Sequence, residues 1–319
     1  MALAQMGVFC ALYIGCHQLD INGGITQAKS LFRLNVQKKS WRWLSAPATK
    51  REGVSTSSNH MPQLNVQGVT YPIDAILFDK DGTLLNFGDL WIGWFDQLIT
   101  TVNRRLATFS SPPPPLAFAE LYRRVGIYPD SRLWDPTGPL TIGSLDDIVT
   151  IVALSLFEGG LAWNDATEIT YDALQSLDAS LDWSRCVTPV AGLLGFVARA
   201  RHAGVQLAVV TSDDHRNALR HLSLLSLSDH FSVVLGHDQV PRGKPFPDMA
   251  LAACQQLGVT PERTLIIGDS NGDMAMGKAA GLRAGIGICA APHLSGEHLT
   301  LAAHVIRDYD TLAFGTSPR

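Results

Sequence analysis

The sequence predicts an α/β protein built on a doubly wound parallel sheet with an inserted all-helical segment. From Pro189 onward, short apolar runs typical of buried strands alternate with stretches typical of amphipathic helices. Such alternation indicates parallel strands joined by right-handed crossovers. Earlier in the chain a single strand pattern is followed, from about Asp89 to Asp182, by no strand pattern at all. The helical stretch therefore interrupts the sheet after its first strand.

The first predicted strand ends at two carboxylates. A run over residues 73–78 that is apolar except for Asp74 stops at Asp79 and Asp81, and a Gly-Thr turn follows. Because side chains alternate along a strand, Asp79 and Asp81 start on the same side and Lys80 on the other. Two carboxylates this close repel each other. The pair makes physical sense if a cation lies between them or if one acid holds a proton.

The insertion is predicted to be built from amphipathic helices, at residues 91–102, 118–125, 145–157 and 165–177. The third helix is entered through Ser144 and carries two acids in its first turn, as helix N-termini prefer. Residues 126–139 are rich in Pro and Gly and are expected to form a loop. The tryptophans of the insertion are expected to pack in its core rather than to form an aromatic ligand box.

The remainder of the chain is predicted to alternate between the two kinds of element. Helices are expected at 193–202, 216–227, 247–257 and 273–280, and strands at 205–210, 232–235, 264–267 and 284–288. A last strand or turn at 305–306 and a short final helix are expected to close the chain. Asp213, Asp214 and His215 are interpreted as cap and helix-start residues.

The length of 319 residues suits one large or two ordinary domains. We expect a core domain formed by residues 61–88 and 186–319, and a helical domain over residues 89–185. Residues 1–60 carry seven Lys or Arg and two Asp or Glu and show no sustained periodicity. They are therefore expected to form a poorly ordered N-terminal extension.

The remaining residues hold 18 basic and 27 acidic side chains, a balance of −9 within a net charge of −4. This excess of acid argues against nucleic acid as a partner, but a small anion stays compatible because a metal can invert the local field. The sequence has no run of about 18 apolar residues, so no membrane-spanning helix is expected. The five cysteines are scattered along the sequence and include no CxxC pair, which favours a reducing, cytoplasmic location. They are Cys10, Cys16, Cys186, Cys254 and Cys289. A monomer or homodimer is expected.

Polar residues follow three of the predicted strands, at the edge where the carboxyl ends of parallel strands meet. They are Asp79 and Asp81, then Thr211 and Ser212, then Asp269 with Asp273; Lys244, between a Gly and a Pro, precedes the last group. Acids around one point attract a hard cation such as Mg²⁺, which prefers oxygen ligands. A carboxylate can attack phosphorus, a hydroxyl and a lysine can bind phosphoryl oxygens, and a second acid can move protons. These residue types therefore suit phosphoryl transfer.

The order of these residues resembles the four motifs of the haloacid dehalogenase-like hydrolase superfamily. The matching residues are Asp79-Lys80-Asp81-Gly82-Thr83, Thr211, Lys244 and Gly268-Asp269-x-x-x-Asp273. The resemblance covers about residues 73–310. The helical insertion, placed directly after the first motif, resembles the C1 cap of the phosphoglycolate phosphatase-like branch. Lys80 is not the commonest residue at its place in the first motif.

The resemblance implies a role for each motif residue. Asp79 would be the nucleophile, and Asp81 would be the general acid and base. Thr211 would bond the phosphoryl group together with backbone donors from Ser212, and Lys244 would neutralise the nucleophile and the phosphate.

The resemblance also implies a Mg²⁺ site. Asp79 would bind the ion through its carboxylate and Asp81 through its carbonyl oxygen. Asp269 would bind it directly. Asp273 would hold it directly, through water, or through Lys244.

The resemblance implies a Mg²⁺-dependent phosphatase that hydrolyses a small phosphorylated metabolite through an aspartyl-phosphate. A sugar phosphomutase of the same superfamily and a non-catalytic phospho-ligand binding protein stay open as alternatives. A dehalogenase is disfavoured because breaking a carbon–halogen bond needs no acid at Asp81. A phosphonate hydrolase is disfavoured because that resemblance predicts a lysine in the cap, and residues 84–185 contain none.

The sequence does not assign the substrate. In this branch the cap is expected to choose it, and five arginines of the insertion could each contact an anionic group: Arg104, Arg105, Arg123, Arg124 and Arg132.

Overall fold

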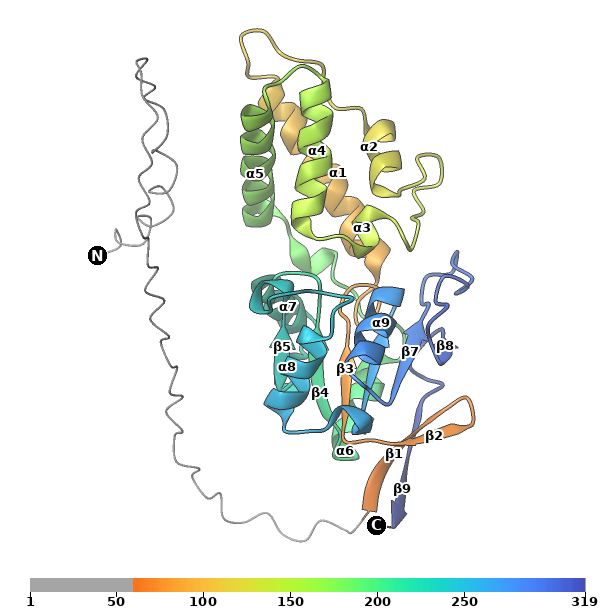
Figure 1. The fold of residues 1–319 in the computed structure, drawn as a ribbon. Helices are drawn as coiled ribbons and strands as arrows, with labels where there is room; N and C mark the ends of the chain where they lie inside the picture. The colour runs from red at the N-terminus through yellow and green to blue at the C-terminus, as the bar shows by residue number, and fades with distance from the viewer. Residues whose placement is uncertain (1–59, 319) are drawn as a thin grey trace, which may run out of the picture. The chain divides into compact units, whose positions relative to one another are not determined.

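A computed structural model of the chain describes residues 60–318 (Figure 1). The N-terminal extension expected over residues 1–60 lies outside the described residues, apart from His60, which begins a strand. Cys10 and Cys16 lie outside them too. The described cysteines, Cys186, Cys254 and Cys289, are free thiols.

The described chain is organised around a parallel sheet of six strands in the order β5-β4-β3-β6-β7-β8. The strands are β3 (Ala75–Phe78), β4 (Gln206–Val210), β5 (Val233–Leu235), β6 (Thr264–Gly268), β7 (Ala284–Ile288) and β8 (His304–Ile306). Strand β3 lies between β4 and β6, with Phe78 in register with Val209 and Ile267. The predicted doubly wound α/β fold is confirmed, and the polar residues after these three strands fall at one edge of the sheet.

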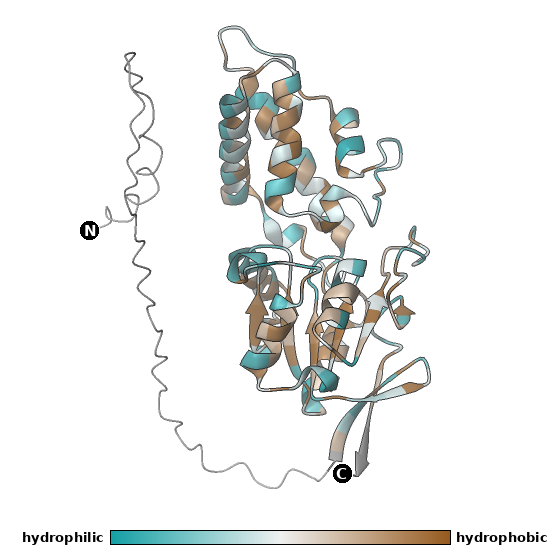
Figure 2. Ribbon diagram, in the orientation of Figure 1, coloured by the Kyte–Doolittle hydropathy of each residue, from teal (hydrophilic) through white to brown (hydrophobic). Residues whose placement is uncertain are grey.

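Helices cover both faces of this sheet, and alternate strand residues face opposite helices. The helices are α6 (Leu193–His202), α7 (His215–Leu224), α8 (Asp248–Leu257) and α9 (Asn271–Ala279). Phe78 packs with Phe196 of α6, at 6.3 Å between ring centroids, whereas Leu77 packs in a cluster that contains Met249 of α8. Figure 2 shows the central strands in the brown of hydrophobic residues. Burial on both faces explains why the sequences of the central strands are almost entirely apolar.

The insertion after β3 is helical, as predicted. Its helices are α1 (Phe87–Leu106), α2 (Phe118–Val125), α3 (Pro139–Ile142), α4 (Leu145–Glu158) and α5 (Trp163–Ser180), and Figure 1 shows them gathered in one bundle. Helix α4 starts with the expected cap at Ser144, where Ser144 and Asp147 bond reciprocally. The short helix α3 lies at the end of the stretch that was expected to be a loop, where Pro139 occupies a first-turn position that suits proline.

A second, three-stranded antiparallel sheet in the described chain was not predicted. It contains β1 (His60–Val66), β2 (Val69–Pro72) and β9 (Ala313–Pro318), in the order β2-β1-β9. Strands β1 and β2 form a hairpin whose two-residue turn, Gln67-Gly68, has positive φ at both positions, as such turns require. The expected short final helix is wrong, because that segment is strand β9, which pairs with β1.

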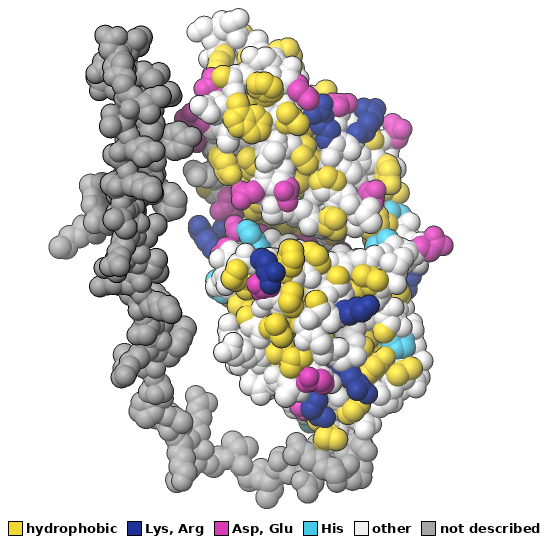
Figure 3. All heavy atoms as spheres, in the orientation of Figure 1, with side chains coloured by type: hydrophobic (Ala, Val, Ile, Leu, Met, Phe, Trp, Pro, Cys, Tyr) yellow, Lys and Arg dark blue, Asp and Glu magenta, His cyan; other side chains and the backbone are white. Residues whose placement is uncertain are grey.

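Charges of both signs are interspersed on the face of the described residues that Figure 3 shows. Figure 3 shows Lys and Arg next to Asp and Glu over both the helical bundle and the sheet domain, so this face has no continuous basic surface for a polyanion. Within residues 60–318, no helix is long and apolar enough to cross a membrane.

Candidate active site

The carboxyl ends of β3, β4 and β6 open into a cavity of about 460 Å³. Its lining includes the residues that the sequence analysis singled out, with one exception; they are Asp79, Asp81, Thr211, Ser212, Lys244 and Asp269. The exception, Asp273, is fully buried behind this wall. The structure thus brings residues separated by almost two hundred positions to one edge of the sheet.

Three carboxylates and one lysine form the centre of this site. Asp79, Asp269 and Asp273 each place an oxygen within 4.8 Å of the others. Lys244 Nζ contacts Asp79 Oδ1 and lies 2.6 Å from Asp273 Oδ1. One lysine does not balance three acids, so this cluster carries excess negative charge if all are ionised.

The pKa values reflect this crowding. Burial raises the pKa of Asp79 from 3.8 to about 7, although Lys244 acts to lower it. Burial and the neighbouring Asp79 raise the pKa of Asp269 well above its usual value. Burial acts to lower the pKa of Lys244, but Asp273 and Asp79 hold it above the ordinary value, so Lys244 stays charged.

The cluster fits a hard cation. Its donors are all carboxylate oxygens, which suit Mg²⁺, and a divalent ion would offset the excess negative charge. The backbone leaves room for the acids, because a Cβ at Gly82 would lie 2.0 Å from Asp269 Oδ2 and one at Gly268 would lie 2.4 Å from Asp273 Cγ. Both glycines therefore allow the carboxylates to approach the strand ends.

Asp273 has two roles in the local structure. Its Oδ2 accepts hydrogen bonds from the Ser270 hydroxyl at 2.6 Å and from the Ser270 backbone N–H at 3.1 Å, which caps α9. Its Oδ1 faces Lys244. The first-turn position that the sequence indicated is therefore correct, and the same carboxylate also fixes the lysine of the site.

The prediction that Lys80 lies on the side opposite Asp81 is wrong. Lys80 is fully buried, and its Nζ lies 2.8 Å from both carboxylate oxygens of Asp81. The strand geometry behind that prediction ends at Phe78, after which the Lys80 carbonyl accepts a turn bond from Leu84 N–H at 2.8 Å. Beyond the strand, alternation no longer separates neighbouring side chains.

Lys80 also pairs with Asp213, at 3.0 Å from its Oδ2. Asp213 was expected to be a cap residue, but its side chain is buried and shared between Lys80 and Asn217. Asp214 does take the cap position of α7, without a side-chain cap bond, and His215 is the first residue of that helix. The physical reason for the correction is that a buried lysine needs anionic partners, and Asp213 is the second one within reach.

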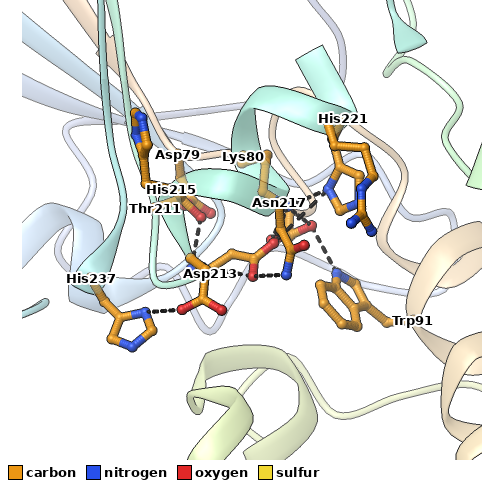
Figure 4. Close-up of polar contacts among 12 residues, drawn as sticks. Asp79, Lys80, Trp91, Thr211, Asp213, His215, Asn217, His221 and His237 are labelled. Carbon is orange, nitrogen blue, oxygen red and sulfur yellow. Dashed lines mark hydrogen bonds and ion pairs between the residues drawn. The ribbon is translucent and has the colours of Figure 1, made fainter. Parts of the chain in front are cut away.

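Two further side chains complete the network around Lys80. His221 Nδ1 lies 3.0 Å from Lys80 Nζ, and Trp91 Nε1 donates to Asp81 Oδ1 at 2.8 Å. Burial, together with Lys80, lowers the pKa of His221 from 6.5 to about 3, so its neutral ring accepts the bond from Lys80. Figure 4 shows Trp91 from α1 and His221 and Asn217 from α7 converging on this cluster.

Lys80 and Trp91 both bond to the Asp81 carboxylate, which is not one of the three clustered acids. Burial raises the pKa of Asp81, and Lys80 opposes that rise. The resemblance to the superfamily motifs assigns the metal contact of Asp81 to its backbone carbonyl oxygen rather than to its carboxylate.

Thr211 is placed to bind an anion in the cavity. It is 1% exposed, and its hydroxyl oxygen accepts a bond from Asp213 N–H at 3.1 Å. That bond leaves the hydroxyl hydrogen available for donation. Ser212 lines the cavity beside it.

Trp91 and His221 were not singled out by the sequence analysis as site residues. Trp91 was treated as a core residue of its helix, and the structure does bury it, but its indole N–H also points at Asp81. His221 lies inside a helix with no motif around it. Only the presence of a lysine between the two acids hinted that buried partners were needed.

Comparisons with known proteins place the chain in a family and identify relatives. A family model described as haloacid dehalogenase-like hydrolase matches residues 73–281. A phosphoglycolate phosphatase of Pseudomonas putida is 26% identical over 208 residues, which are 65% of this chain and 66% of that protein, just under two thirds of its length. Pyrophosphatase PpaX of Halalkalibacterium halodurans is 27% identical over 67% of this chain and 83% of its own.

Solved structures show the same fold. A predicted phosphoglycolate phosphatase from Haemophilus somnus superposes with a TM-score of 0.55 at 18% identity, covering 74% of this chain and 95% of that one.

Proposed function

Since this chain belongs to the haloacid dehalogenase-like hydrolases, we propose that it is a Mg²⁺-dependent phosphatase that hydrolyses a small phosphomonoester through an aspartyl-phosphate on Asp79. The observation that carries the proposal is the pairing of Asp79 with Lys244 beside Asp269 and Asp273, all at the carboxyl edge of the sheet. The phosphatase names of relatives such as that of Pseudomonas putida support it.

In the first step, an Asp79 carboxylate oxygen attacks phosphorus and the bond between phosphorus and the alcohol oxygen breaks. Asp81, in its protonated form, gives its proton to the departing oxygen. In the second step, a water attacks phosphorus and Asp81 accepts its proton. The bond between phosphorus and Asp79 then breaks, which releases phosphate and restores both carboxyl groups.

The other site residues bind and orient the phosphoryl group. Thr211 donates its free hydroxyl hydrogen, Ser212 supplies its backbone N–H, and Lys244 offsets charge on the phosphoryl oxygens as it spreads. Lys80 and Trp91 set the direction of the Asp81 carboxylate.

A Mg²⁺ ion would be held by the carboxylates of Asp79, Asp269 and Asp273 and by the carbonyl oxygen of Asp81. When bound, it supplies positive charge that keeps Asp79 ionised and lowers the repulsion between that nucleophile and the phosphate.

Helices α1–α5 would act as the cap of this enzyme, with residues 61–88 and 186–319 as its core. The cavity lining supports this division, because it combines strand-end residues of the sheet with side chains of α1, α3 and α4.

A phosphate-release assay on the full chain tests the proposal by measuring whether hydrolysis requires a divalent metal. EDTA is expected to remove phosphomonoester hydrolysis, and added Mg²⁺ to restore it. Asp269→Asn should raise the Mg²⁺ concentration needed for half-maximal activity, whereas Asp130→Asn, at an exposed position outside the cavity, should not. Hydrolysis that persists without divalent metal would contradict the three-carboxylate site.

A further inference from the structure

The cavity has two chemically different ends. The end at the sheet carries the acids, Thr211 and Lys244 described above. The opposite wall comes from α1, α3, the start of α4 and the residues just before α3 and α4, and its large side chains are aromatic or aliphatic; they are Phe87, Trp91, Trp94, Leu140, Leu145 and Ile148. Trp91 and Trp94 pack edge to face with ring centroids 5.1 Å apart. The organic part of a phosphomonoester bound at Asp79 would face this wall.

The wall offers no positive charge for a second anionic group. Of the Lys and Arg residues in the described chain, Lys244 alone lines this cavity, and Asp79 and Asp273 already pair with it. The remaining charges of the lining are carboxylates. A carboxylate or a second phosphate on the substrate would therefore lie between apolar side chains and like charges.

The arginines that were expected to contact an anion are not part of the cavity wall. Four of them pair with acids of the helical bundle: Arg105 with Asp172, Arg123 and Arg124 with Glu120, and Arg132 with Asp96. Arg104 is exposed near the end of α1. Arg132 lines a neighbouring pocket, where it pairs with Asp96, and none of the five arginines lines the wall that faces Asp79.

The hydroxyl groups of the wall are also committed. Thr137 donates to Asp135 Oδ1 at 2.7 Å, Thr141 donates to the Asp135 carbonyl at 2.7 Å, and Ser144 donates to Asp147 at 2.8 Å. The indole N–H of Trp91 donates to Asp81. A sugar held here would bury hydroxyl groups beside few free donors, which is unfavourable.

Resting on the proposed function, we propose that the substrate is the phosphomonoester of an uncharged, apolar alcohol that carries an aromatic ring or a branched hydrocarbon group. Its phosphate occupies the Asp79 end, and its organic group packs against the tryptophans of α1 and the aliphatic residues of α3 and α4. The cavity of about 460 Å³ falls within the size range of small-molecule sites. Burial of apolar surface then provides the binding energy that ion pairs provide for acidic or multiply phosphorylated substrates.

The proposal is tested by measuring kcat/KM of the full chain with Mg²⁺ for naphthyl phosphate, phosphoglycolate, glucose 6-phosphate and pyrophosphate. Naphthyl phosphate is expected to exceed each of the others by about tenfold or more, a factor that matches the loss of one good polar contact. A phosphoglycolate, sugar phosphate or pyrophosphate value at or above that of naphthyl phosphate would overturn the proposal.

A charge placed at the mouth of the cavity should reverse the preference. Ile142 lines the cavity yet is 52% exposed, so Ile142→Arg should fold normally. It is expected to raise the ratio of phosphoglycolate to naphthyl phosphate kcat/KM by about tenfold. Leu154→Arg, on an exposed part of α4 outside the cavity, is the matched control and should leave the ratio unchanged. An equal ratio in both variants would contradict the assignment of this wall to the organic group.

Binding without turnover separates this proposal from the proposed function. Tryptophan fluorescence of the chain can be titrated with naphthylphosphonate and with phosphonoacetate, which are not hydrolysed as esters. Tighter binding of naphthylphosphonate supports the apolar pocket even if every phosphomonoester fails as a substrate, a result that would count against the phosphatase alone. Equal or weaker binding would overturn the pocket assignment.

Discussion

Lys80 Nζ lies 2.8 Å from both carboxylate oxygens of Asp81, and the lysine is completely buried. The residue between the two acids of the first motif therefore points back toward the second acid. It fixes Asp81 on one side while Trp91 fixes it on the other. The two acids of the motif therefore have different lysine partners: Lys244 for Asp79 and Lys80 for Asp81.

Replacing Lys80 with methionine should destabilise the protein strongly. Asp81 and Asp213 would lose a shared buried cation, and breaking such a pair costs about 3–5 kcal/mol. The free energy of unfolding, measured by urea denaturation, should fall accordingly. Lys278→Met removes an exposed lysine of α9 and should change the free energy of unfolding little. Similar losses in both variants would show that the Lys80 network adds no stability.

His221 should make the folded state sensitive to acid. Its folded pKa of about 3 lies below the ordinary 6.5, so the unfolded chain binds a proton more readily between these values. Stability from this group is therefore present above pH 6.5 and is lost as the pH falls toward 3. Between about pH 7 and pH 5 the expected loss is about 2 kcal/mol.

Urea denaturation at those two pH values checks this prediction. His221→Gln, whose amide oxygen can still accept from Lys80, should reduce the loss on acidification. His202→Gln, at an exposed position of α6, is the control. If the free energy of unfolding of the His221 variant depends on pH as that of the control does, the buried neutral histidine does not cause the loss of stability in acid.

Gly82 should be required for the position of Asp269. The backbone φ at Gly82 is 73°, and a Cβ there would lie 2.0 Å from Asp269 Oδ2. Gly82→Ala is therefore expected to lower both stability and phosphate release, since the carboxylate must move.

Gly68→Ala is the matched control, because Gly68 has a φ of 85° but no atom within 4 Å of the added Cβ. It should cost only the backbone strain of a left-handed alanine, about 1–2 kcal/mol, with activity kept. Equal losses of activity in the two variants would mean that Gly82 acts through the backbone alone.

Much of the fold could be predicted from the sequence because the central strands are buried on both faces. Strand β3 contains only apolar residues, and the neighbouring strands β4 and β6 are apolar after their first residue. The ends of these strands and the polar residues after them were therefore identifiable. Strand β9 was missed for the opposite reason. Apart from Phe314 its residues are small or polar or proline, and it is a strand because β1, from the other end of the described chain, pairs with it.

The site could be predicted where a motif determines it and not where tertiary packing does. Lys244 and Asp273 were expected near the strand ends and lie there in contact with each other. Two partners of Lys80 have no motif of their own: Asp213, between β4 and α7, and His221 of α7. Only the folded chain identifies them. The apolar wall of the cavity could not be predicted from the sequence either. The sequence does not show that four of the five arginines of the insertion pair with acids of the helical bundle.

The most direct test of the proposed mechanism is phosphate release by Asp79→Asn, with Mg²⁺, on a phosphomonoester that the unmodified chain hydrolyses. Asparagine keeps the size of the side chain and removes the nucleophilic carboxylate, so turnover should be lost while circular dichroism and the urea midpoint show a folded protein. Turnover close to that of the unmodified chain would contradict an aspartyl-phosphate on Asp79.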